Sequence, residues 1–208
     1  MAASEVIVIG GAPFSGKTTL ARRLAVQRGH ALVAIDDLGT ALRALTTPQS
    51  HPDLHPMAGW DYRAYYVAHP PSTLIEHSRR EHQALWPAIA AVIHAHLQWA
   101  GPVILEGWQL DPERVLAVTH PRLRACWLLA DDTVLEARLR TDTAFYQGCT
   151  DVERLIRHYL ARSRWVNDRV RQAAGHEAGA VVQVGPADTV DAVVTRSVQH
   201  LWPGEASS

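Results

Sequence analysis

Short apolar runs alternate with longer amphipathic segments along most of this chain. Five runs are predicted to form strands: Val6–Ile9, Ala31–Ile35, Val103–Leu105, Ala125–Leu129 and Val181–Val184. The first run is apolar at every position, which is typical of a central parallel strand that is buried on both faces. Because helical periodicity occupies the intervals, the sequence predicts an alternating α/β fold with helices on both faces of a parallel sheet.

Three helices are predicted with particular clarity. The segment Ser72–Trp99 carries leucine and isoleucine at helical spacing along one side, and we expect Pro87 to kink this helix or to divide it. Thr150 and Glu153 form a capping-box pattern before a second long helix. The last helix is predicted at Thr189–Leu201.

Composition restricts the class of protein further. The 208 residues are 47% hydrophobic and 20% charged, with a net charge of −1, which suits a single domain over residues 1–208. The charge balance argues against a general nucleic-acid or membrane-surface binder, and no apolar run has the length of a membrane span.

Cys126 and Cys149 fit neither a disulfide framework nor a zinc-ligand spacing, and no signal-peptide pattern begins the chain. A cytoplasmic location is therefore expected.

The lysine count points to a specific segment. Of the 20 basic residues, 19 are arginine, and the single lysine is Lys17. It lies in Gly11-Ala12-Pro13-Phe14-Ser15-Gly16-Lys17-Thr18, a complete G-x-x-x-x-G-K-[ST] pattern between a predicted strand and a predicted helix. Glycines let backbone N–H groups approach phosphate oxygens, and the helix N-terminus adds positive charge. The predicted ATP-binding residues are Gly11, Ala12, Pro13, Phe14, Ser15, Gly16, Lys17, Thr18 and Thr19.

Within this loop, Lys17 is expected to follow the β- and γ-phosphates, and Thr18 to bind Mg²⁺. The motif alone does not separate kinases from other nucleotide-binding proteins. The sequence lacks the N-K-x-D pattern of guanine-specific GTPases, the L-S-G-G-Q signature of transporter ATPases and the apolar strand ending in Asp-Glu of hexameric ATPases. These absences favour a small-molecule kinase.

Acidic residues follow two of the predicted strands. Since the carboxyl ends of parallel strands lie at the same edge as the phosphate loop, Asp36 is predicted to accept the proton of an attacking hydroxyl or to hold a Mg²⁺-bound water. Asp37 is predicted to cap a helix at Leu38–Leu45, although either aspartate could be the base. Glu106 ends the third strand and is a candidate for Mg²⁺ or substrate binding.

Arginine and aromatic residues supply the other candidates. Arg138 and Arg140 adjoin a predicted lid at residues 138–150, where arginines stabilise the charge of phosphoryl transfer. Residues 46–71, rich in proline and aromatic side chains, are predicted to form an ordered insertion that binds the substrate. The predicted catalytic residues are Lys17, Asp36, Asp37, Arg138 and Arg140. The predicted substrate-binding residues are Asp36, Tyr62, Arg63, Arg79, Glu106 and Trp108. Simple packing of the aromatic side chains is the alternative.

These segments together resemble a known group. The loop and its helix, the I-D-D after the second strand, the V-I-L-E-G strand and the arginine-bearing lid are similar to P-loop kinases of the nucleoside-monophosphate-kinase superfamily, within the AAA-type P-loop NTPase domains. This group includes shikimate and gluconate kinases, chloramphenicol phosphotransferase and 5′-hydroxyl polynucleotide kinases, and E-G-W-Q-L-D-P-E is most similar to 2-phosphoglycerate-kinase-like proteins. The resemblance implies a five-stranded parallel sheet in the order 2-3-1-4-5, ATP as donor and an acceptor-selecting lobe after the second strand.

The preferred functional hypothesis is an ATP-dependent kinase that uses Mg²⁺ and transfers the γ-phosphate to a hydroxyl of a small metabolite. One alternative is a 5′-hydroxyl polynucleotide kinase, which the net charge does not favour. Another is a nucleotide-dependent regulatory ATPase that has no small-molecule acceptor. A monomer or a homodimer with no membrane partner is expected, and the acceptor stays unnamed.

Overall fold

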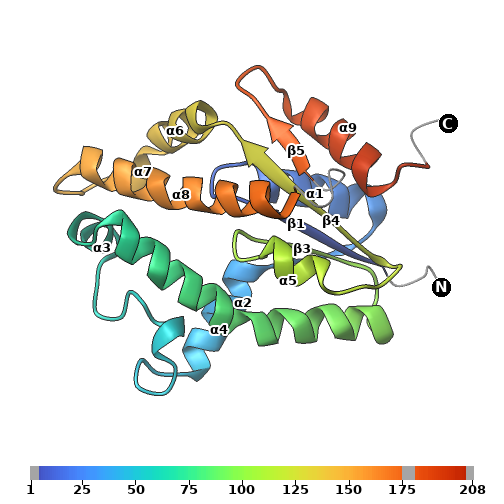
Figure 1. The fold of residues 1–208 in the computed structure, drawn as a ribbon, viewed down its shortest axis with the longest axis horizontal. Helices are drawn as coiled ribbons and strands as arrows, with labels where there is room; N and C mark the ends of the chain where they lie inside the picture. The colour runs from blue at the N-terminus through green and yellow to red at the C-terminus, as the bar shows by residue number, and fades with distance from the viewer. Residues whose placement is uncertain (1–4, 175–180, 205–208) are drawn as a thin grey trace.

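A parallel sheet forms the centre of the computed structural model, which describes residues 5–174 and 181–204. The strands are β1 (Val6–Gly11), β2 (Ala31–Ala34), β3 (Val103–Glu106), β4 (Leu123–Ala130) and β5 (Val181–Val184). Their order is β2-β3-β1-β4-β5 and every pair is parallel, which confirms the predicted α/β topology. All strands therefore end at one edge, toward the left of Figure 1.

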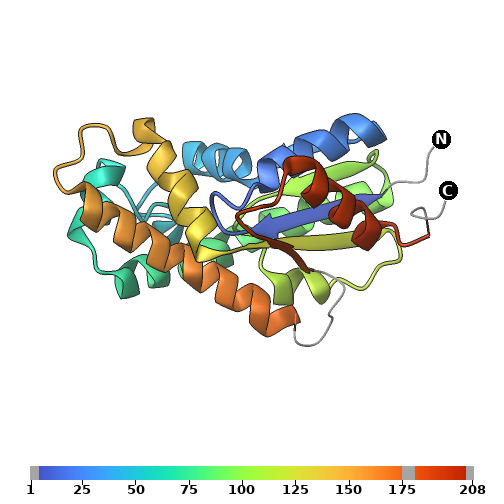
Figure 2. The same ribbon diagram turned by 90° about the horizontal axis from the view of Figure 1, so that it is seen from above.

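Helices cover both faces of this sheet. They are α1 (Lys17–Arg28), α2 (Ile35–Leu45), α3 (Tyr62–Ala68), α4 (Pro71–Gln98), α5 (Pro112–Leu116), α6 (Asp132–Thr141), α7 (Thr143–Tyr146), α8 (Val152–Ala174) and α9 (Val190–Leu201), with a 3₁₀ turn at Pro52–Leu54. Helices α1 and α9 pack on one face, and α4, α5 and α8 pack on the other, as Figures 1 and 2 show. The result is a three-layer arrangement.

Alternate side chains of β1 enter two separate cores. Ile7 and Ile9 belong to the core that includes Leu20 of α1, whereas Val8 belongs to the core that includes Ile89 of α4. All five side chains are fully buried. This two-sided burial explains why the first strand is apolar at every position.

Helix α4 passes through Pro87 without dividing, although the sequence allowed a break there. Proline removes one backbone hydrogen bond from a helix interior. Leu85 and Ile89, on either side of it, are fully buried against the sheet. We infer that this packing outweighs the local loss, because tertiary contacts supply most of the stability of a protein helix.

Helix α2 begins earlier than the sequence predicted. Its first residue is Ile35, and Ala34 is its N-cap, so the prediction that Asp37 caps a helix at Leu38–Leu45 is wrong. Ile35 is fully buried, and the chain therefore turns from strand to helix without an intervening loop. Asp36 and Asp37 lie in the first turn, where the positive end of the helix dipole stabilises carboxylates.

The start of α8 also differs in detail from the sequence prediction. The carboxylate of Asp151 accepts a hydrogen bond of 3.0 Å from the backbone N–H of Arg154, which makes Asp151 the capping residue in place of Thr150. The carboxylate of Glu153 instead forms an ion pair with Arg140. The capping-box pattern located the helix correctly but assigned its cap to the wrong residue.

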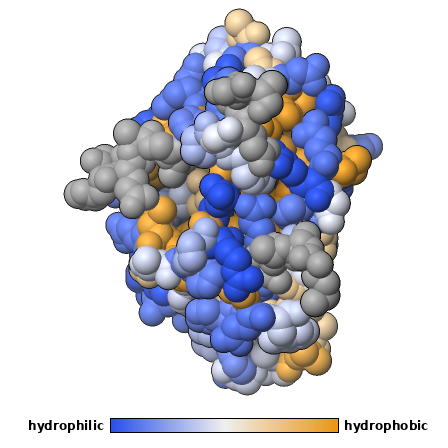
Figure 3. All heavy atoms as spheres, turned by 90° about the vertical axis from the view of Figure 1, so that its right-hand side faces the viewer, coloured by the Kyte–Doolittle hydropathy of each residue, from blue (hydrophilic) through white to orange (hydrophobic). Residues whose placement is uncertain are grey.

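The end of the molecule at which the strands begin faces the viewer in Figure 3. Hydrophilic side chains dominate this face, and hydrophobic ones occur in scattered groups. Among the described residues, no helix combines the length and the apolar character that a membrane span requires.

Trp127 of β4 fixes the contact between the two central strands. It pairs in register with Gly10 of β1 and is 1% exposed. Its indole N–H donates a hydrogen bond of 3.0 Å to the carbonyl oxygen of Leu110. A Cβ atom on Gly10 would lie 2.3 Å from two atoms of the indole ring, so this position has no room for a side chain.

We predict that Gly10→Ala lowers the free energy of unfolding by about 1–3 kcal/mol, because the added methyl group overpacks a rigid ring. Chemical denaturation of the ligand-free protein measures this change. Gly101→Ala is the matched control, since a Cβ at Gly101 meets no atom within 4 Å; its expected effect is within about 0.5 kcal/mol. Equal stability of the two variants would contradict the steric argument.

Candidate active site

The phosphate loop connects β1 to α1 through three residues with positive φ. These are Gly11 (135°), Phe14 (65°) and Gly16 (101°), and Phe14 is the one non-glycine residue of this kind in the described part of the chain. Glycine adopts such angles without strain, whereas phenylalanine does not. Strained backbone of this kind concentrates at functional sites, so the loop is a candidate site on its geometry alone.

Two buried polar side chains face the interior of this loop. The hydroxyl of Ser15 is buried and has no hydrogen-bond partner among the described residues. Lys17 is 8% exposed; burial lowers its pKa, and the carboxylates of Glu106 and Asp36 oppose that shift. Since buried polar groups are nearly always paired, these two groups fit a loop that receives a phosphate.

Glu106 lies beside the loop at the end of β3. Its backbone pairs with Ile9, and its carboxylate accepts hydrogen bonds of 3.1 and 3.2 Å from the hydroxyl of Thr18. Burial raises the pKa of Glu106, while Lys17 and Thr18 act in the opposite direction. Hydroxyl and carboxylate oxygens are ligands that Mg²⁺ prefers, so the two predicted metal-binding residues do meet and fit that ion.

Asp36 extends from the first turn of α2 toward the same cluster. Its carboxylate accepts a hydrogen bond of 2.6 Å from the side-chain amide of Gln109, which fixes its orientation. Burial dominates the pKa shifts of Lys17 and Glu106, and the charge of Asp36 contributes to both. Asp36 and Asp37 are both exposed in this turn, but Asp37 is not among the groups that shift these two pKa values. Asp36 is therefore the aspartate that Gln109 orients and whose charge is coupled to Lys17 and Glu106.

A cleft of about 390 Å³ opens on the other side of the loop. Its lining comprises residues 14–20 of the loop and α1, Arg138 of α6, and Val184, Asp188, Thr189, Val190, Val193 and Val194 near the start of α9. This volume is in the range of small-ligand pockets and suits the base and ribose of a nucleotide. The sequence analysis missed the residues after β5, although they follow a strand that ends at the same sheet edge.

The two predicted lid arginines point to different places. Arg138 donates a hydrogen bond of 2.9 Å to the carbonyl oxygen of Phe14 and therefore lies on the phosphate loop. Arg140 forms ion pairs of 2.9 and 2.8 Å with Glu136 and Glu153 on the surface. Residues two positions apart do not share a helix face, which explains why only one of the pair reaches the loop.

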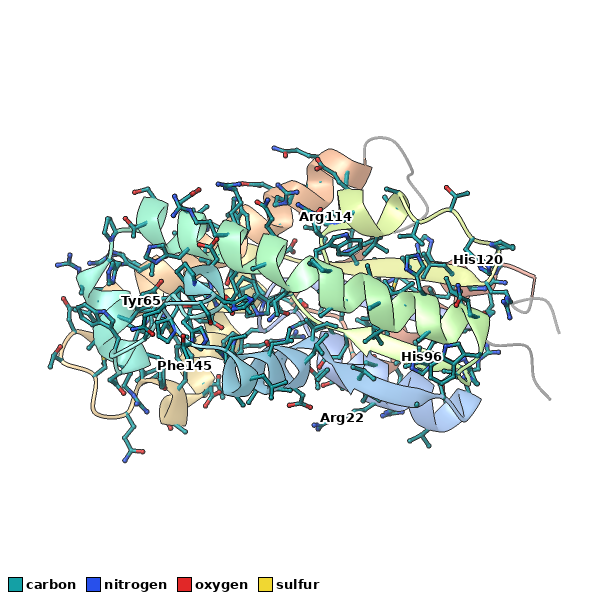
Figure 4. The ribbon with its side chains drawn as sticks, turned by 90° about the horizontal axis from the view of Figure 1, so that it is seen from below. Arg22, Tyr65, His96, Arg114, His120 and Phe145 are labelled. Carbon is teal, nitrogen blue, oxygen red and sulfur yellow. The ribbon has the colours of Figure 1, made fainter. Side chains whose placement is uncertain are left out.

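Two predicted substrate-binding residues contact the lid instead. The hydroxyl of Tyr62 donates a hydrogen bond to the carbonyl oxygen of Phe145, and Arg63 donates one of 3.3 Å to that of Ala144. The ring of Phe145 also packs against Phe14, with centroids 6.0 Å apart. The ring of Phe145 thus contacts both Tyr62 of the insertion and Phe14 of the phosphate loop, at the end of the molecule that the labels Tyr65 and Phe145 mark in Figure 4.

The two remaining predicted substrate-binding residues lie in different places. Arg79 is held on the surface of α4 by an ion pair of 2.8 Å with Glu76, and it lies outside the nucleotide cleft. Trp108 is half-buried, and the guanidinium carbon of Arg162 lies 4.3 Å from its ring centroid. Sequence analysis did not select Arg162, because nothing in the sequence pattern distinguishes it from Arg157, an exposed arginine of the same helix.

The sequence matches no family model, and comparison with curated proteins finds no significant match. Comparison of structures is informative. A gluconokinase from Sinorhizobium meliloti aligns over 96% of this chain and 92% of its own, with a TM-score of 0.54 and 17% identity. A deoxyadenosine kinase from M. mycoides with bound dATP aligns over 95% and 98%, with a TM-score of 0.51 and 9% identity. The chain therefore has the fold of the P-loop kinases.

Proposed function

We propose that the protein is an ATP-dependent kinase that phosphorylates a hydroxyl group of a small molecule. One observation carries this proposal: Lys17, the Thr18–Glu106 pair and Asp36 converge at one end of a strained phosphate loop. A nucleotide-binding loop needs the first three residues, whereas an oriented carboxylate beside the site of the γ-phosphate is what a kinase adds. The similar structures described above are both named kinases, which agrees with this proposal.

The residues have distinct roles in this reaction. The loop N–H groups and Lys17 hold the triphosphate, with Arg138 against the loop. Thr18 and Glu106 would hold Mg²⁺, which supplies charge neutralisation on the phosphates when it is bound. Asp36, oriented by Gln109, accepts the hydroxyl proton while the acceptor oxygen bonds to the γ-phosphorus and the bond to the ADP oxygen breaks. The lid excludes water, which would otherwise compete as acceptor.

The two alternatives predict different behaviour. A regulatory ATPase would release the γ-phosphate to water, and a polynucleotide kinase would label 5′-hydroxyl oligonucleotides with an affinity that falls steeply with salt. Incubation with γ-labelled ATP and separate pools of small metabolites and oligonucleotides distinguishes the three functions. We expect label in a small molecule, in keeping with a cytoplasmic enzyme of metabolism. Label found only in free phosphate would refute the kinase assignment.

Lys17→Met is predicted to weaken ATP binding by about tenfold to a hundredfold, since it removes a charged hydrogen-bond donor. Because burial lowers the pKa of Lys17, its charge is costly in the ligand-free fold, and the variant should be no less stable than the wild type at neutral pH. Titration calorimetry and thermal unfolding measure the two effects. Arg80→Met, which removes an exposed cation of α4, serves as the control.

Asp36→Asn is predicted to lower kcat by about 10²–10⁴-fold, the usual contribution of a general base, while the Kd of MgATP stays close to that of the wild type. Asp37→Asn removes the same charge from the same turn and is the matched comparison. Steady-state kinetics and nucleotide titrations on both variants decide between the two aspartates. A larger loss of kcat in Asp37→Asn would transfer the role to that residue.

Glu106→Gln is predicted to raise the Mg²⁺ concentration needed for half-maximal activity by about tenfold or more. The variant also has a pH signature in the ligand-free protein. Because burial raises the pKa of Glu106, its ionisation makes wild-type unfolding free energy fall as the pH rises from the ordinary glutamate pKa to the raised one. This component should vanish in Glu106→Gln and persist in Glu113→Gln, which changes an exposed glutamate. Denaturation between pH 4 and 8 measures it.

A further inference from the structure

Among the described residues, Arg162 of α8 forms no salt bridge, although the charge of Glu81 acts on it from the same cavity. Its guanidinium carbon lies 4.3 Å from the ring centroid of Trp108, 4.6 Å from that of Tyr159 and 5.1 Å from that of Tyr66. Its Nε atom is buried without a hydrogen-bond partner, and the guanidinium donates a hydrogen bond to the hydroxyl of Tyr159, which brings no charge. A guanidinium enclosed by aromatic rings without a salt bridge is costly unless a ligand brings an anion.

The carboxylate that shares a cavity with Arg162 is Glu81 of α4, and it already forms an ion pair with another arginine. Arg43 of α2 forms an ion pair of 3.1 Å with it. Gly39 lies beside this pair, where a Cβ would be 3.2 Å from a terminal nitrogen of Arg43. Glu81 also interacts electrostatically with Arg162, so one carboxylate is shared between two guanidinium groups and Arg162 keeps unbalanced positive charge.

The position of Arg162 places it on the acceptor side of the loop. The nucleotide cleft is lined by Arg138 but not by Arg162. Arg162 instead lines a small cavity beneath the insertion, together with Glu81 and Tyr66. Its charge nevertheless reaches Lys17, as does that of Asp36. Arg162 therefore lies against the insertion and is electrostatically coupled to the lysine of the phosphate loop.

We propose that Arg162 binds an anionic group of the acceptor, so that the substrate is a small hydroxy compound carrying a carboxylate or a phosphate. This inference rests on the proposed kinase function. The acceptor would place its hydroxyl at Asp36 and its anionic group on the guanidinium of Arg162. The ring of Trp108 packs against this guanidinium. The cavity beside Arg162 is about 20 Å³, enough for about one water molecule, so the insertion must move when the acceptor binds.

The test compares matched acceptors in the phosphate-transfer assay. One pool contains hydroxy acids and phosphate esters such as gluconate, glycerate and glycerol 3-phosphate, and the other contains neutral partners such as glucitol, glycerol and nucleosides. We expect label in the anionic pool. Arg162→Lys and Arg162→Gln should lower kcat/KM for an anionic acceptor about tenfold to a hundredfold, as for loss of a charged hydrogen bond. Arg157→Gln, on the exposed side of α8, should not.

Each outcome tests either the anion-binding role of Arg162 or the proposed kinase function. Transfer to neutral acceptors alone would overturn the inference while leaving the kinase function intact. Equal loss of acceptor-independent ATP hydrolysis in Arg162→Gln would place the guanidinium on the γ-phosphate and also overturn it. If label appears only in free phosphate, the kinase function is refuted. The anion site is then tested separately, by a binding measurement. A rise in Tm caused by the anionic pool with MgADP in the wild type, absent in Arg162→Gln, would support the anion site; no rise would refute it.

Discussion

The site depends on one electrostatic constraint: a buried ammonium group must stay charged in a place from which water is largely removed. Burial disfavours the charged form of Lys17, and two carboxylates from separate elements, Glu106 of β3 and Asp36 of α2, compensate in part. This compensation requires three chain segments to end at the same sheet edge, which the parallel topology provides. In the proposed kinase, a triphosphate would add negative charge beside Lys17 and so complete this compensation.

The sequence predicted the framework well because its signals are local. An apolar strand, a glycine loop and an amphipathic helix identify themselves within about 25 residues, and the sheet order followed from the resemblance. The errors were local as well: α2 begins at Ile35 because burial of that side chain overrides the turn-forming tendency of the Asp36-Asp37 pair. Pro87 failed to divide α4 for the same reason, since tertiary packing outweighs propensity.

The candidate site was predictable only where the motif or strand ends define it. Lys17, Thr18, Glu106 and Asp36 come together as the topology requires. The sequence could not show which arginines belong to the site, because a buried and an exposed arginine of one helix look alike in sequence. What distinguishes Arg162 is three aromatic rings, Tyr66, Trp108 and Tyr159, which lie on three different segments. Such a cage exists only after folding.

The aromatic contact of Phe14 with Phe145 has a consequence for substrate binding. It links the strained backbone of the phosphate loop to the lid, and Tyr62 links the same lid residue to the insertion. In the proposed kinase, the ATP site and the acceptor site would therefore both adjoin Phe145 of the lid. A displacement of Phe145 on binding of one substrate would change the packing beside the other site. Binding of the two substrates would then be energetically coupled through Phe145.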